Sequence, residues 1–99
     1  MVNKSYAIGY RFCERVKKLF ESKGYFVVKN PKSQFPDLFA WRKGANGFFI
    51  FAIESKVNKY LSKEEKKRAT TLLKNDNITA LLVAWRKNHK IKLYKFERK

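Results

Sequence analysis

The sequence of 99 residues is poor in the residues that build disulfide or zinc frameworks, with one cysteine and one histidine. One cysteine cannot form an internal disulfide, and with one histidine it cannot supply a self-contained Cys/His zinc site. No apolar run approaches the roughly 20 residues of a membrane span. Residues 1–5 lack the apolar stretch of a signal peptide. We therefore expect an intracellular protein.

Acidic residues are also few: 8 Asp and Glu stand against 24 Lys and Arg, which gives a formal net charge of +16. Such a surplus repels itself in a compact domain unless counterions or phosphates offset it. Membrane binding usually uses one basic amphipathic helix or a basic tail, whereas here the basic residues are spread along the chain. The 44% of apolar residues indicates a folded protein. The charge therefore favours nucleic acid over a membrane as the partner.

The apolar pattern predicts one domain over residues 1–99, because no repeat, low-complexity tract or linker interrupts it. Helical spacing indicates a helix over residues 10–23, and Ser62 and Glu65 fit a capping box that opens a second helix ending near Lys74. Short β-branched and aromatic runs predict strands over residues 25–29, 38–41, 48–56, 80–85 and 90–96. The resulting order is α-β-β-β-α-β-β, a mixed α/β layer structure. Residues 48–56 are the most apolar run, and we expect a central strand covered on both faces.

Two of the few carboxylates stand on or beside apolar strands, where an ionised acid needs a partner. Asp37 follows Pro36 at the start of the second strand, and Glu54 lies two residues before Lys56. Residues two apart on a strand share a face, and a tight hairpin would bring Asp37 alongside Glu54. Two adjacent carboxylates form the hard-oxygen site that Mg²⁺ prefers. Lys56 could then stabilise charge on a phosphate or orient a metal-activated water.

A purely structural interpretation of the same residues is also available. Glu54 and Lys56 would form a salt bridge at a strand end, and Asp37 would be a turn residue after Pro36. Either half alone is common in unrelated chains. The combination of both, joined by a hairpin in a strongly basic sheet, favours a metal-dependent nuclease.

These segments resemble the PD-(D/E)xK nuclease signature, with the closest likeness to archaeal and viral Holliday-junction resolvases. Pro36-Asp37, an apolar strand and Glu54-Ser55-Lys56 carry the motif, and residues 9–12 and 23–29 extend the likeness over nearly the whole chain. The resemblance implies a restriction-endonuclease-like core, in which a mixed β-sheet is flanked by helices, and a homodimer. It also implies that Asp37, Glu54 and the Ser55 carbonyl ligate Mg²⁺, with Mn²⁺ as a substitute, and that Lys56 is the catalytic lysine.

The first helix departs from the family pattern, which places a further catalytic glutamate there. Aligned without a gap, that position falls on Cys13, and Glu14 is the next residue. Successive helix positions differ by about 100°, so the two are not equivalent. Either the helix is shifted and Glu14 supplies the third catalytic, metal-binding carboxylate, which we expect, or that carboxylate is missing and metal binding is weaker. Cys13 would otherwise be a small buried thiol.

We expect a Mg²⁺-dependent, structure-selective DNA endonuclease, a Holliday-junction resolvase that makes paired symmetric nicks during DNA recombination. Alternatives are a related nuclease acting on flaps, ends or duplex, and a non-catalytic basic nucleic-acid-binding protein. The protein would act in the cytoplasm or nucleoid, or in the host cell if its source is a virus. The candidate DNA-binding residues are Arg11, Lys29, Lys32, Ser33, Lys59, Lys63, Lys66 and Lys67.

Overall fold

The computed structural model describes residues 4–31, 34–58, 60–75 and 77–97, and side chains from residue 7 onward. The elements follow the predicted order α-β-β-β-α-β-β, which is confirmed. They are α1 (Lys4–Ser22), β1 (Phe26–Lys29), β2 (Leu38–Gly44), β3 (Gly47–Lys56), α2 (Lys63–Leu72), β4 (Ala80–Lys87) and β5 (Lys90–Lys95). None of the described helices is long and apolar enough to cross a membrane.

The strands form one mixed sheet with the order β1-β2-β3-β4-β5. Neighbouring strands run antiparallel except β3 and β4, which are parallel. A parallel pair needs a crossover connection, and α2 is part of that crossover. The most apolar strand, β3, therefore lies at the centre of the sheet, as its composition predicts.

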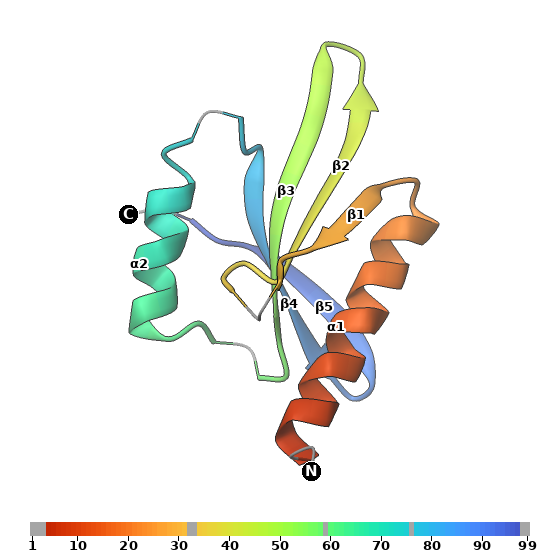
Figure 1. Cartoon of the computed structure of the whole chain (residues 1–99), viewed down its shortest axis with the longest axis vertical. Helices are drawn as coiled ribbons and strands as arrows, with labels where there is room; N and C mark the ends of the chain where they lie inside the picture. The colour runs from red at the N-terminus through yellow and green to blue at the C-terminus, as the bar shows by residue number, and fades with distance from the viewer. Residues whose placement is uncertain (1–3, 32–33, 59, 76, 98–99) are drawn as a thin grey trace.

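The two helices cover opposite faces of the sheet (Figure 1). On one face, Phe12 and Val16 of α1 pack against Ile53 of β3. On the other face, Ala69 of α2 packs with Ala52 of β3. Because side chains alternate along a strand, Glu54 and Lys56 lie on the α2 face with Ala52, whereas Ser55 lies on the α1 face with Ile53.

The turns agree with the sequence pattern. Gly24 follows α1 with φ +90, the left-handed conformation that commonly ends a helix. Asn88 and His89 join β4 to β5 with φ values of 50 and 65. Positive φ at both central residues is typical of a two-residue type I′ hairpin turn. His89 is thus an exposed turn residue.

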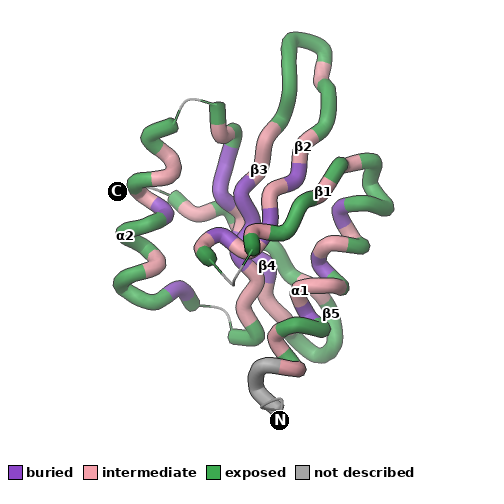
Figure 2. The backbone as a smooth tube through the Cα atoms, viewed as in Figure 1, coloured by how far each residue is buried: buried purple, intermediate pink, exposed green. Residues whose placement is uncertain are grey.

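Two expectations are wrong in part. The first helix begins at Lys4 rather than at residue 10, and the apolar pattern does not reveal this because Ile8 and Tyr10 are exposed. Strand β3 is covered on both faces only in its second half, since Phe48 is 63% and Phe49 is 42% exposed. The β2–β3 hairpin extends past both helices, and its end is exposed (Figure 2).

Candidate active site

The loop before β2 delivers Asp37 to the sheet. The backbone N–H of Asn30 donates to the Asp37 carbonyl at 2.8 Å, and its side-chain Nδ2 donates to the Pro36 carbonyl at 3.0 Å. Both bonds close the loop over residues 30–37. The antiparallel register of β2 and β3 then places Asp37 next to Glu54.

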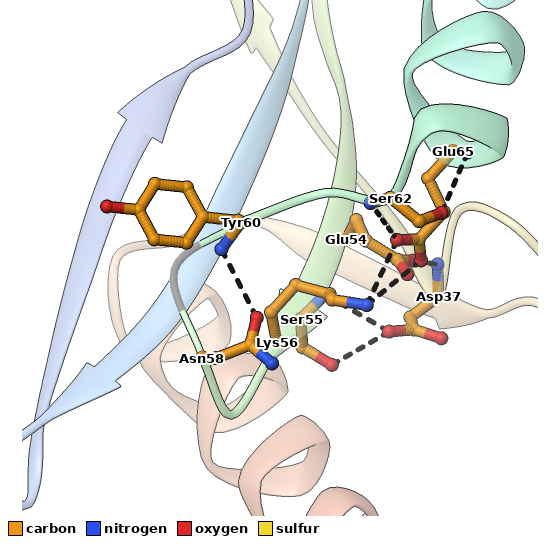
Figure 3. A network of polar contacts seen from close by, with 8 residues as sticks. All are labelled: Asp37, Glu54, Ser55, Lys56, Asn58, Tyr60, Ser62 and Glu65. Atoms are coloured by element: carbon orange, nitrogen blue, oxygen red, sulfur yellow. Dashed lines mark hydrogen bonds and ion pairs between the residues drawn. The ribbon is translucent and has the colours of Figure 1, made fainter.

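Asp37, Glu54 and Ser55 form one hydrogen-bonded group, drawn in Figure 3. The Asp37 N–H donates to Glu54 Oε1 at 3.1 Å. The Ser55 N–H and Oγ both donate to Asp37 Oδ2, at 3.0 and 2.8 Å. Each carboxylate is therefore oriented by a backbone amide of the neighbouring strand, and the two carboxyl groups lie side by side.

Glu54 is a buried acid with only 7% of its surface exposed. Burial, followed by the charge of Asp37 and the nearby Glu65, raises the pKa of Glu54 to about 9. At neutral pH without a cation, Glu54 therefore carries a proton. This proton lies among the carboxyl groups of Glu54, Asp37 and Glu65. A divalent cation bound by Asp37 and Glu54 would replace this proton, because it stabilises the ionised form.

Lys56 lies on the same face of β3 as Glu54 but does not bond to it. Its Nζ lies 3.0 and 3.1 Å from Glu65 Oε1 and Oε2, at the start of α2. The structure therefore contains a Lys56–Glu65 salt bridge instead of the Glu54–Lys56 salt bridge of the purely structural interpretation. Sequence analysis identified Glu65 only as a helix cap and missed this contact. The separation of nine residues follows no helix or strand period, so no sequence pattern signals it.

The pair of carboxylates fits a hard divalent cation. Mg²⁺ keeps several waters and commonly binds through one or two protein carboxylates, which Asp37 and Glu54 can supply. The Ser55 carbonyl, which the sequence resemblance implies as a further ligand, belongs to the same segment of β3. Within the part of the chain that the structure describes, no group of three or more His, Cys, Asp or Glu residues is arranged to hold a metal.

The structure does not bring Glu14 to this pair, which differs from our expectation. Glu14 forms an ion pair with Lys29, and hydrogen bonding to that ammonium lowers the pKa of Glu14. Cys13 instead faces the site. Burial raises the pKa of its thiol, while a hydrogen bond with Ser55 opposes the rise and the nearby charge of Asp37 adds to it. The thiol of Cys13, rather than the carboxylate of Glu14, therefore lies beside Asp37 and Ser55.

The candidate DNA-binding residues are distributed over both faces of the molecule. Arg11 on α1 and Lys63, Lys66 and Lys67 on α2 are exposed. Lys29 is engaged locally, since it pairs with Glu14 and its Nζ lies 4.2 Å from the centre of the Tyr10 ring. The remaining candidates, Lys32, Ser33 and Lys59, lie outside the described residues.

Comparison with known proteins identifies the fold. No protein-family model matches the chain, and no curated protein matches its sequence significantly. Among solved structures, the same fold occurs in an archaeal Holliday-junction resolvase, the class that the sequence motif predicts. That structure is Hjc from the hyperthermophile Archaeoglobus fulgidus, which is 22% identical in sequence with a TM-score of 0.69. The match covers 92% of this chain and 77% of Hjc. The mixed β-sheet flanked by helices is thereby confirmed.

Proposed function

We propose that this protein is a Mg²⁺-dependent, structure-selective DNA endonuclease that resolves Holliday junctions. The observation that carries the proposal is the contact of Asp37 with the buried Glu54, in a protein with a net charge of +16. Two adjacent carboxylates are costly without a cation, so their juxtaposition indicates a cation site. The fold shared with Hjc, described as a Holliday-junction resolvase, supports DNA as the substrate.

The chain's own residues have separable roles in phosphodiester hydrolysis. Bound Mg²⁺ would supply Lewis-acid chemistry and lower the pKa of a water ligand. Asp37 and Glu54 hold the ion where β2 and β3 meet, with the Ser55 carbonyl as a further ligand. The Ser55 amide and hydroxyl keep the Asp37 carboxylate oriented. Lys56 presents its ammonium on the Glu54 side of β3, where it stabilises negative charge that develops on the phosphate.

The substrate would be read through its backbone rather than its bases. A surface rich in Lys and Arg neutralises phosphates and carries no direct sequence information. A four-way junction has approximate two-fold symmetry, and resolving it requires two cuts on opposing strands. A homodimer with two-fold symmetry supplies two identical sites in that relation. We therefore propose a homodimer in solution, and light scattering at micromolar concentration measures its mass.

Cleavage of labelled four-way junction and matched duplex, with Mg²⁺ and with EDTA, tests the proposal. We expect paired symmetric nicks in the junction, dependent on Mg²⁺, and little cleavage of the duplex. Equal cleavage of duplex or flap would make the protein a related nuclease with another substrate. Tight binding without metal-dependent cleavage would contradict the proposal and indicate a non-catalytic DNA-binding protein.

A further inference from the structure

The ammonium of Lys56 is held by Glu65, a carboxylate outside the proposed Asp37–Glu54 ligand pair that also contacts the Glu54 side chain. Glu65 accepts from Lys56 Nζ with both oxygens, at 3.0 and 3.1 Å. The two side chains are only 23% and 19% exposed. A forked, partly buried contact of this kind is more restrictive than a surface ion pair, so it limits where a long and flexible lysine can point.

Glu65 is itself fixed by the start of α2. The Ser62 backbone N–H donates to Glu65 Oε1 at 2.8 Å, and the Glu65 N–H donates to Ser62 Oγ at 3.1 Å. These two bonds form a complete capping box. Glu65 Oε1 therefore serves both the helix cap and Lys56. Figure 3 shows how this oxygen links the beginning of α2 to the end of β3.

Apart from Glu65, an acid of the cation site shares the strand of Lys56. Glu54 lies two residues earlier on the same face of β3, and its carboxyl group lies beside that of Asp37. A lysine released from Glu65 would become mobile and could move toward these carboxylates, where it would compete with a divalent cation for them. Binding of Lys56 by Glu65 keeps the ammonium beside the cation site without occupying it.

We infer that Glu65 is a positioning residue that holds Lys56 in place and keeps it off the Asp37–Glu54 pair. The inference deepens the proposed function and rests on it, because Lys56 acts on the scissile phosphate only if that function is correct. The simpler alternative makes Glu65 a helix cap with an incidental lysine neighbour. The two interpretations predict different behaviour of Lys56 in a variant that keeps the helix cap but removes the charge of residue 65.

Glu65→Gln makes that separation, because glutamine also completes a capping box but presents only one acceptor oxygen. Glu64→Gln is the matched control, since it removes the same charge one residue away on the exposed side of α2. Glu65→Asp is a second variant that keeps the charge and shortens its reach toward Lys56. Circular dichroism melts identify which variants stay folded at the assay temperature.

The first readout needs neither metal nor DNA. Limited acetylation with acetic anhydride, followed by mass spectrometry, reports the reactivity of Lys56 relative to exposed Lys66 in the same molecule. Loss of a charge-assisted contact should raise Lys56 labelling roughly fivefold to tenfold in Glu65→Gln. Glu65→Asp should raise it in the same direction, and Glu64→Gln should leave it unchanged. Unchanged labelling in both Glu65 variants would overturn the inference.

The second readout is single-turnover junction cleavage at increasing Mg²⁺. Glu65→Gln should lower the maximal rate by roughly tenfold to a hundredfold, the usual effect of a misplaced catalytic group, and should raise the Mg²⁺ concentration for half-maximal cleavage. If Glu65→Gln raises Lys56 labelling but keeps the wild-type cleavage rate and Mg²⁺ requirement, then Glu65 acts only as a helix cap. Absence of cleavage by the wild-type protein would reject the proposed function, whereas labelling alone would still decide whether Glu65 holds Lys56.

Discussion

Burial and neighbouring negative charge both raise the pKa of Glu54. Only 7% of its surface is exposed, and its side chain contacts that of Asp37. Both effects favour the protonated form. The fold therefore holds Glu54, a residue of the proposed cation site, in a position that is unfavourable for its ionised form.

This position makes the stability of the metal-free protein depend on pH. The folded pKa of Glu54 is about 9, above its ordinary value of 4.5, so between these values the folded state binds a proton that the unfolded state has lost. The associated stability is complete below about pH 4.5 and is lost as pH rises toward 9, with a limiting slope of about 1.4 kcal/mol per pH unit. Urea unfolding between pH 6 and 9 in EDTA measures this slope.

Glu54→Gln should flatten that slope, because glutamine has no proton to lose. The exposed Glu21 provides the matched control, and Glu21→Gln should retain the wild-type dependence. A slope that is equal in wild type and Glu54→Gln would show that Glu54 is not the buried acid described above.

Position 13 offers a gain-of-function prediction. Cys13 lies against Ser55 and near Asp37, the position to which the sequence resemblance assigns a glutamate, whereas Glu14 is ion-paired with Lys29. Cys13→Glu should lower the Mg²⁺ needed for half-maximal cleavage by roughly tenfold, because affinity rises with the number of charged ligands. Glu14→Gln should change it little. A large increase in the Mg²⁺ requirement from Glu14→Gln would show that Glu14 is the third carboxylate after all.

At the scale of elements, α2 depends on its cap. Ser62 supplies the oxygen that accepts the Glu65 amide. The polar helix has Ala69 as its buried residue, and Leu72 packs beside it. Ser62→Ala should lower the free energy of unfolding by about 1 kcal/mol. Urea denaturation measures the loss, and Ser22→Ala, in the last turn of α1, is a control outside this cap. No loss in Ser62→Ala would contradict the role of the capping box.

The sequence predicts local elements better than their ends. The capping box, the hairpin turns and the central position of residues 48–56 follow from turn chemistry and apolar pattern. The start of α1 does not, because its first turns carry exposed apolar side chains that give no periodic signal. The exposed half of β3 was missed because strand composition cannot show how far a covering helix reaches.

The sequence likewise predicts some contacts of the candidate site but not others. A tight hairpin between the strands predicted over residues 38–41 and 48–56 brings Asp37 near Glu54, so this contact could be predicted from spacing. The Lys56–Glu65 contact depends on how the connection after β3 folds back, and the choice between Cys13 and Glu14 depends on the rotation of α1 against the sheet. Both are set by tertiary packing rather than by any local pattern.

At the scale of the whole molecule, the net charge of +16 should dominate the proposed binding of DNA. Binding that neutralises about six phosphates predicts a slope near −5 in a plot of log affinity against log salt concentration, at roughly −0.9 per phosphate. Fluorescence anisotropy of labelled junction between 50 and 300 mM KCl measures it. Affinity that does not vary with salt would contradict a surface that reads the DNA backbone.

The central claim is that Asp37 and Glu54 form the metal site of a junction-cleaving nuclease. Its most direct test is the cleavage of a labelled four-way junction in Mg²⁺ by wild type and by Asp37→Asn, with binding measured on the same samples. We expect paired symmetric nicks from the wild type. Asp37→Asn should bind the junction as tightly or slightly more tightly, since it removes a negative charge near phosphate, and should not cleave it. Cleavage by Asp37→Asn at the wild-type rate would contradict the account.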